Sequence, residues 1–192
     1  MNTAFEKMEF CASNATRQDG ERLAKTITLL GDENWRVRYA AAIALGDRRD
    51  AKAVDALVEL LHRENTAPLF AQPNLEGSAP AGSSVRFAMI FPEGTTEATK
   101  EAWRRRGRVL QAACLALGNL GEVSPAALEL LHRYATDQGC DYAVRAAACK
   151  ALGQLARPES LPTLKIATSD EEWCTKTEAS KALQTLSAGS RT

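Results

Sequence analysis

One ten-residue pattern constrains the fold of this 192-residue chain more than any other feature, because it occurs three times. Each copy has Val, Ala, Ala, Ala, Leu and Gly at offsets 0, 3, 4, 7, 8 and 9. The copies are residues 37–46, 109–118 and 144–153, and a decayed fourth copy covers residues 175–184. This spacing predicts an α-helix with a narrow, mostly alanine stripe, which lets neighbouring helices approach closely. The shared glycine is expected to form a left-handed C-terminal cap.

A second apolar helix is expected after each of three motif helices, by which we mean the helices that carry the ten-residue pattern. These partner helices are predicted from residues 54–63, 124–133 and 161–167. Pro125 and Pro162 stand near the starts of two of them, where a missing N–H costs little. Stacked antiparallel helical pairs predict an all-α fold, a right-handed solenoid or α-α superhelix.

The repeats define the expected organisation of a single domain covering residues 1–192. Its predicted parts are an N-terminal helical pair (1–31), a repeat (32–63), an irregular insertion (64–95), two further repeats (96–137 and 138–168) and a C-terminal capping helix (169–187). Polar residues replace part of the apolar stripe in the fourth copy, as a terminal repeat requires where its outer face meets water.

The insertion interrupts the repeat period. The first two copies begin 72 residues apart, whereas the later copies follow at 35 and 31 residues. Residues 65–95 are rich in proline and glycine, and Val85, Phe87, Met89 and Phe91 alternate with period two, which is typical of a strand. Two interpretations remain open: a functional β-hairpin or packed loop, or a loop that covers otherwise exposed core.

The starts of the motif helices carry a resemblance to a known family. Asp141, Val144 and Arg145 form a D-x-x-V-R sequence, and residues 34–38 match it with Asn in place of Asp. The second copy departs from this pattern, with Leu110 where arginine is usual. Together with the A-L-G ending and the following L-x-x-L-L helix, these residues resemble HEAT repeats, in particular the bacterial HEAT-like repeats of phycobilisome lyases. The resemblance implies a curved ribbon with an extended concave surface.

Charge is concentrated in one place. The chain has 24 basic and 24 acidic residues, so no overall attraction to nucleic acid or an anionic membrane is expected. A long helix is predicted from Glu97 to Leu117, with Thr95 or Thr96 as its N-cap, and its first half is strongly basic. Arg104 and Arg108 share a face of this helix, whereas Arg105 is positioned to pair with Glu101 on a solvated flank. The other interpretation is a patch for an acidic protein or, less well supported by the zero net charge, a phosphate backbone.

Catalytic chemistry finds little support in the sequence. The two histidines, His62 and His132, occupy equivalent positions in two copies of L-L-H-R, so the repeat accounts for them. The five cysteines contain no C-x-x-C pair and are expected to be buried free thiols. The HEAT-like deoxyhypusine hydroxylases hold a di-iron centre through paired His-Glu motifs, whereas this chain has His-Arg. We therefore expect no catalytic residue, metal or cofactor, and a chain that is not an enzyme.

These observations predict a HEAT-repeat scaffold or adaptor that binds a protein partner through its concave face, the 65–95 insertion and the arginine-rich helix. The partner is expected to have an acidic surface. The candidate contacts are Lys100, Arg104, Arg105 and Arg108, with Phe87, Met89 and Phe91 for an apolar contact. The resemblance implies an alternative, a phycobilin lyase-like or chaperone-like protein acting on a bilin or its carrier. Nucleic-acid binding like that of HEAT-like DNA glycosylases is the weaker third possibility, because Trp35, Trp103 and Trp173 are expected to pack in repeat register. With no long apolar run, a cytoplasmic protein without membrane contact is expected.

Overall fold

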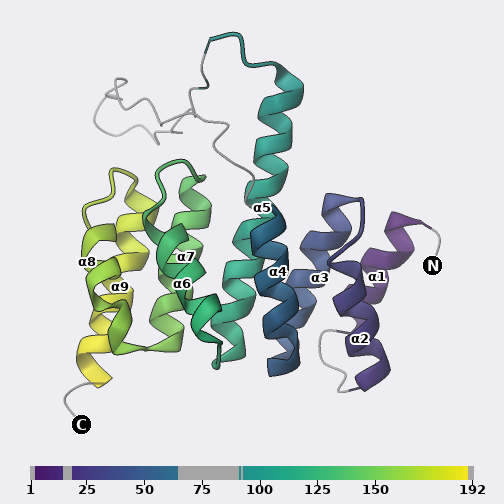
Figure 1. Cartoon of the computed structure of the whole chain (residues 1–192), viewed down its shortest axis with the longest axis horizontal. Helices are drawn as coiled ribbons and strands as arrows, with labels where there is room; N and C mark the ends of the chain where they lie inside the picture. The colour runs from purple at the N-terminus through teal and green to yellow at the C-terminus, as the bar shows by residue number, and fades with distance from the viewer. Residues whose placement is uncertain (1–2, 15–18, 65–90, 92, 190–192) are drawn as a thin grey trace.

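The fold is all-α, as the sequence predicts. A computed structural model describes residues 3–14, 19–64, 91 and 93–189. Every regular element in these ranges is helical (Figure 1): α1 (Ala4–Asn14), α2 (Gly20–Leu29), α3 (Trp35–Arg48), η1 (Ala51–Ala53), α4 (Val54–Glu64), α5 (Glu97–Leu120), α6 (Pro125–Thr136), α7 (Tyr142–Leu155), η2 (Pro158–Ser160), α8 (Leu161–Ala167) and α9 (Trp173–Gly189). The β-hairpin considered for the insertion lies outside the described residues. Among the helices described, none has the length and apolar character needed to cross a membrane.

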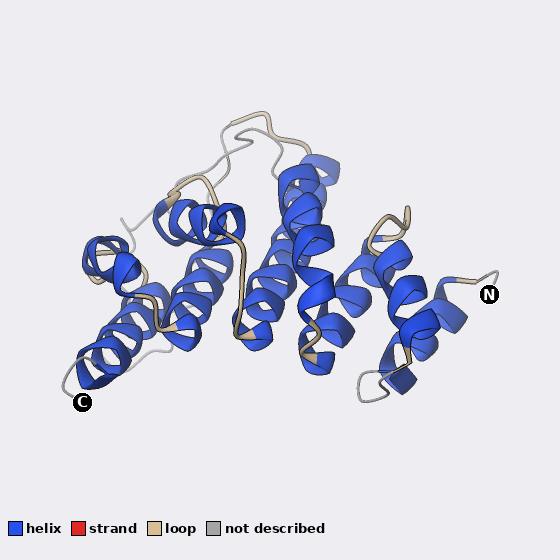
Figure 2. Cartoon of the chain, turned by 60° about the horizontal axis from the view of Figure 1, so that its bottom comes forward, coloured by secondary structure: helices blue, strands red, loops and turns tan. Residues whose placement is uncertain are grey.

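The helices form two layers. In the first, the motif layer, α1 packs against α3, α3 against α5, α5 against α7 and α7 against α9. The second layer contains α2, α4, α6 and α8, each of which contacts a helix of the motif layer. Figure 2 shows the two layers following an arch, with the two ends of the chain at opposite ends of the row. Consecutive helical pairs therefore stack into a solenoid.

The shared glycines lie inside the motif helices, which corrects the predicted role of C-terminal cap. Gly46, Gly118 and Gly153 are each followed by at least two further helical residues. The left-handed residues that end these helices are Arg49, Gly121 and Ala156, with φ of 53°, 78° and 50°. The glycines of the repeat therefore serve another purpose.

Each of these glycines receives an alanine from the next motif helix. A Cβ atom added to Gly118 would lie 2.7 Å from the Cα atom of Ala151, closer than real Cβ contacts allow. The same distance separates a Cβ on Gly46 from the Cα of Ala116. The glycine at offset 9 of one copy thus contacts the alanine at offset 7 of the next. Gly153 meets Ala182 of α9 in the same way.

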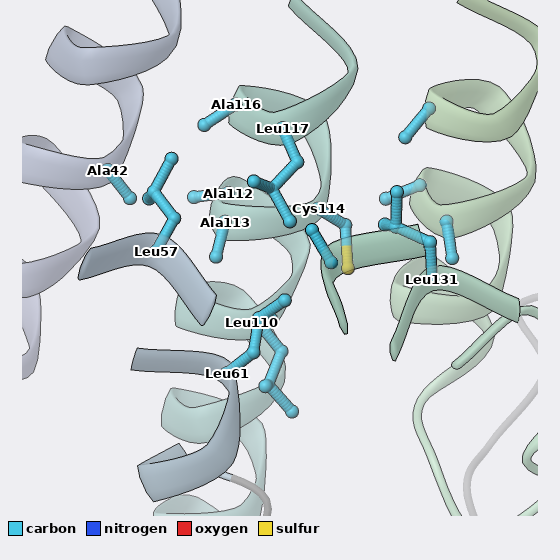
Figure 3. Close-up of a cluster of buried hydrophobic side chains, with 14 of the residues drawn as sticks. Ala42, Leu57, Leu61, Leu110, Ala112, Ala113, Cys114, Ala116, Leu117 and Leu131 are labelled. Carbon is cyan, nitrogen blue, oxygen red and sulfur yellow. The ribbon is translucent and has the colours of Figure 1, made fainter. Parts of the chain in front are cut away.

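Leucines from the second layer fill the space that the alanines leave. Leu57 and Leu61 of α4 are fully buried, as is Leu131 of α6. Figure 3 shows Leu57 between Ala42 of α3 and Ala113 of α5. Small residues in the motif layer and large ones in the second layer therefore form one continuous core.

In two motif helices, the arginine of the V-R sequence forms hydrogen bonds that connect a loop to the end of another helix or to the turn after it. Arg145 is 1 % exposed and donates to both carboxylate oxygens of Asp170, at 2.7 and 3.1 Å, and to the carbonyl of Cys140 at 2.6 Å. Arg38 donates in the same manner to Glu64, at 2.6 Å, and to the carbonyls of residues 32 and 33. Each arginine thus joins the loop before its own helix to the end of the partner helix or the turn after it.

The departure at Leu110 has a physical reason. In α5 the chain before the motif is itself helical, so no loop carbonyls are available to an arginine at this position. Leu110 is instead buried, at 6 % exposure. The repeat sequence therefore changes where the local backbone changes.

Two neighbouring carboxyl groups before α9 have opposite pKa shifts. Burial alone would raise the pKa of Asp170, but the hydrogen bonds from Arg145 and the backbone N–H of Glu172 hold it below its usual value. Burial raises the pKa of Glu172, and the carboxylates of Asp170 and Asp141 add to this effect against the opposing charge of Arg145. Glu172 is 1 % exposed, and its Oε1 atom has no hydrogen-bond partner.

Gly118→Ala should lower the free energy of unfolding by about 1–3 kcal/mol, the usual cost of overpacking, although alanine is the better helix former. Gly20→Ala is the matched control, since a Cβ there meets nothing within 4 Å and the residue opens α2. Urea denaturation followed by circular dichroism measures both variants. Equal stability of the two would contradict the close-contact role of Gly118.

Glu172→Gln should stabilise the protein at pH 7 by about 1 kcal/mol, because it removes a buried charge one of whose oxygens, Oε1, has no hydrogen-bond partner. Since the folded-state pKa is raised, the favourable contribution of protonated Glu172 is fully present below its unfolded pKa of about 4.3 and is lost as pH rises through the folded pKa. The stability difference between the variant and the natural chain should therefore shrink as pH falls toward about 4. Thermal unfolding at a series of pH values measures it, and a pH-independent difference would refute the assignment.

Candidate functional site

Helix α5 extends beyond the motif layer. It has 24 residues, against 14 in α3 and 14 in α7, and its N-terminal half rises above the neighbouring helices (Figure 1). The Oγ1 atom of Thr96 accepts a hydrogen bond from the backbone N–H of Thr99 at 3.2 Å, which confirms one of the two predicted N-caps. The predicted long helix is also confirmed. The N-terminal extension of α5 therefore presents side chains at positions that the shorter motif helices α3 and α7 do not reach.

Three basic side chains lie along one side of this extension. Lys100, Arg104 and Arg108 recur every four residues, so they share a helical face. We call these three residues the basic stripe. Arg104 and Arg108 are exposed, and the Lys100 side chain is 27 % exposed. The grouping of Arg104 and Arg108 agrees with the sequence prediction.

Phe91 lies against the start of the basic stripe. The Lys100 Nζ atom is 5.8 Å from the centroid of its ring, and the Arg104 Cζ atom is 5.7 Å from it. The ring also meets that of Trp103 edge to face, with centroids 5.4 Å apart and planes at 88°. Trp103 is 9 % exposed and anchors this cluster. Of the three predicted apolar contacts, Phe91 thus joins the basic residues, while Phe87 and Met89 lie outside the described residues.

A second aromatic residue, Trp35 of α3, stands beside the other end of the stripe. The Arg108 Cζ atom is 5.9 Å from the centroid of its ring, and the Arg36 Cζ atom is 4.9 Å from it. Trp35 and Arg36 are not among the site residues that the sequence predicts. A signal was available, because Arg36 and Arg108 each immediately precede the valine of a motif copy.

Ion pairs within α5 neutralise part of its charge. Arg105 donates to Glu101 at 2.9 Å, which confirms the predicted pair and turns Arg105 away from the stripe. Lys100 donates to Glu97 at 2.7 Å, and Arg104 lies 3.9 Å from Glu101. Such exposed pairs contribute little to stability, so a partner's carboxylates can replace them at small cost. Residues 97–108 still hold five basic side chains against two acidic ones.

Electrostatic coupling links the stripe to the next repeat. Burial raises the pKa of Asp141, the N-cap of α7, while its hydrogen bond from the backbone N–H of Ala143 and the charges of Arg145 and Arg108 act in the opposite direction. A Cβ atom on Gly107, the residue before Arg108, would lie 3.4 Å from the Cβ atom of Asp141, so the Arg108 end of the stripe lies beside the start of α7.

The histidines and cysteines lie elsewhere. The Nε2 atom of His132 is 3.0 Å from the Oγ atom of Ser160, and burial lowers the pKa of this histidine, with Glu159 opposing the shift. His62 is exposed. The described residues contain no group of three or more His, Cys, Asp or Glu side chains that could hold a metal ion. All five cysteines are free thiols, and burial raises the pKa of Cys149 to about 12.

The prediction that the tryptophans pack is wrong for one of them. Trp103 is buried and Trp35 is partly buried. Trp173, at the start of α9, is 68 % exposed. The sequence places Trp35 and Trp173 at the same offset, but α9 ends the described row of motif helices and has no later neighbour there to cover Trp173.

The two-layered stack of helical pairs defines an α-helical solenoid. The family model described as HEAT repeats matches residues 11–69 and 101–187, so the chain belongs to the HEAT-repeat family. No curated protein matches the chain. Among solved structures, human deoxyhypusine hydroxylase in complex with glycerol is similar to it at 18 % identity and a TM-score of 0.38, over 97 % of this chain and 81 % of that one.

Phe91→Ala should expose Trp103, because the two rings are in edge-to-face contact. In a chain that also carries Trp35→Phe and Trp173→Phe, only Trp103 emits, so its emission should shift to longer wavelength and its quenching by acrylamide should increase. The loss of the ring pair should cost about 0.5–1.5 kcal/mol of stability. Unchanged quenching would show that Phe91 does not cover Trp103 in solution.

Proposed function

We propose that this HEAT-repeat protein is a non-enzymatic scaffold that binds a protein partner with an acidic surface. One observation carries the proposal: α5 extends beyond the motif layer and presents Lys100, Arg104 and Arg108 between two aromatic residues, Phe91 and Trp35. Extended surfaces of stacked helices are suited to hold another macromolecule.

The chemistry of this region favours carboxylates. Guanidinium groups bind carboxylates through paired hydrogen bonds, and the aromatic rings beside Arg104 and Arg108 limit the freedom of these side chains. Less conformational entropy is then lost on binding. Aromatic and arginine side chains also dominate the energetics of protein interfaces.

A protein partner fits this surface better than a nucleic acid does. The affinity of nucleic-acid binding grows with the number of phosphates neutralised, and the basic stripe offers only three cations. The chain as a whole has no net charge to add a long-range attraction. An acidic patch of a protein needs no more than a few such contacts.

Charge reversal at Arg104 and Arg108 should abolish capture of the partner. We expect the double variant Arg104→Glu, Arg108→Glu to retain less than about a tenth of the partner recovered by the natural chain, since each reversal turns an attraction into a repulsion. The measurement is affinity capture from a lysate of the source cells, followed by quantitative mass spectrometry.

Arg105→Glu is the control for a charge reversal on the same helix, made at one residue instead of two. Arg105 was among the predicted contacts, but it pairs with Glu101 outside the basic stripe and is not a contact in this proposal. Recovery of the partner by this control should remain close to that of the natural chain. Identical partner lists for the natural chain and the double variant would overturn the proposal. Recovery of nucleic acid that falls steeply as salt increases would show a phosphate-binding function instead.

A further inference from the structure

A groove runs between α3 and α5 on the side of the motif layer away from the second layer. Its floor is formed by Ala112 and Ala116, and its volume is about 300 Å³. Tyr39 and Ile43 of α3 form one wall, and Leu115 of α5 stands in the other. Ile43 is 40 % exposed and is one of four exposed large apolar residues in the described part of the chain. The close approach of Gly46 to Ala116 fixes the spacing of the two helices here.

This groove continues the basic stripe. Residues 104, 108, 111 and 115 of α5 recur every three or four positions, so the stripe leads directly to Gln111 and Leu115 in the groove wall. On α3, Trp35 and Arg36 precede Tyr39 and Ile43 on the same face in the same way. One end of the channel is therefore basic and aromatic, and its middle is apolar.

The opposite end of the groove has the opposite polarity. Asp47 of α3 and Asn119 of α5 line it, and Asp47 is exposed. An occupant thus meets cations first, then apolar walls, then an acceptor carboxylate. This order of basic, apolar and acidic residues distinguishes the groove from a uniformly apolar surface. It defines both the composition of an occupant and the direction in which the occupant lies.

We infer that the groove between α3 and α5 binds a short extended peptide segment of the partner, with an acidic residue at the basic stripe, apolar side chains beside Ile43 and Leu115, and a basic or neutral donor at Asp47. This inference rests on the proposed function and names the part of the partner that is recognised. Three observations support it: cations at one end of the groove, the Asp47 carboxylate at the other, and the exposed Ile43 with the half-buried Tyr39 and Leu115 between them.

The dimensions agree with a peptide of about five residues. With a rise of about 1.5 Å per residue, Asn119 lies about 16 Å from Arg108 along α5. An extended chain covers this length in about five residues, at about 3.3 Å each. A volume near 300 Å³ is at the lower end of ligand sites and accommodates two or three side chains rather than a large cofactor.

The equivalent groove between α7 and α9 provides an internal comparison. It is smaller, at about 210 Å³, and its lining includes Lys150, Glu178 and Lys181 in place of apolar walls. The same repeat geometry therefore gives a charged groove at one interface and an apolar one at another. Substitutions at Lys150 and Lys181 change a groove of the same origin without touching the proposed site.

The test is selection from a phage-displayed library of random nine-residue peptides on the natural full-length chain, with the Arg104→Glu, Arg108→Glu variant as a parallel target. The natural chain should enrich peptides with an acidic residue followed, within two to four positions in one direction, by two apolar residues. Synthetic fluorescein-labelled versions of these peptides should bind about tenfold more weakly to Ile43→Gln, the order of loss expected at a central interface contact. Ile43 is partly exposed, and glutamine is a good helix former, so this variant should fold.

The control variants are Arg105→Glu and the double variant Lys150→Glu, Lys181→Glu, which should bind the same peptides with unchanged affinity. Circular dichroism and the unfolding temperature establish that every variant is folded. The inference is overturned if the natural chain enriches no peptides over the charge-reversed target, or if the enriched peptides are acidic but lack apolar residues. It is also overturned if the peptides bind Ile43→Gln as tightly as they bind the natural chain.

The outcome also separates this inference from the proposed function. If Arg104→Glu, Arg108→Glu abolishes capture of the partner while Ile43→Gln leaves it intact, the scaffold function stands and the groove is not the binding site. If neither variant changes capture of the partner, both the proposed function and the inference about the groove are wrong. If both variants reduce capture and the selected peptides compete with the partner, both are supported.

Discussion

The contact between glycine and alanine of successive motif helices is the constraint on which the rest of this structure depends. At three interfaces in the motif layer, a glycine at offset 9 accepts an alanine of the next helix so closely that no Cβ would fit. Backbones at this distance fix both the spacing and the register of the helices, because a displaced helix would bring a larger residue against the glycine. The second layer then needs only leucines of suitable length to complete the core. Spacing and register together also determine the grooves on the open side of the motif layer.

The proposed functions are located where the repeat is irregular. The first two motif copies are separated by an insertion, and the helix that follows it is longer than its neighbours. Because that extension is not needed to bury the core, its outer residues are free to be basic and aromatic. The same helix continues into the motif layer, so the basic stripe and the apolar groove belong to one rigid element. Rigid placement of charged groups lowers the entropic cost of binding a partner.

Much of the fold could be predicted from the sequence, because the relevant interactions are local. Helical periodicity predicts the motif helices, Thr96 was one of two residues identified as the cap of α5, and the spacing of Glu101 and Arg105 predicts their ion pair. The prediction that the repeat glycines are helix caps is wrong for a physical reason. A glycine near a helix end suits a left-handed cap and a close helix contact equally well, and only the neighbouring helix distinguishes the two. The position of the three tryptophans near the starts of motif helices predicts packing in repeat register, yet Trp173 is exposed because it lies at the end of the described row.

The sequence by itself determined the all-α repeat, the start of α5 at Glu97 and the face shared by Arg104 and Arg108, since each follows from residues a few positions apart. Only the tertiary structure decided which side chains from different helices meet. It brings Trp35 and Arg36 of α3 beside Arg108 of α5, places Phe91 over Lys100 and Arg104, and leaves Ile43 and Leu115 facing one groove. These contacts join residues up to about seventy positions apart, and their geometry depends on how closely two helices approach, which no local pattern specifies.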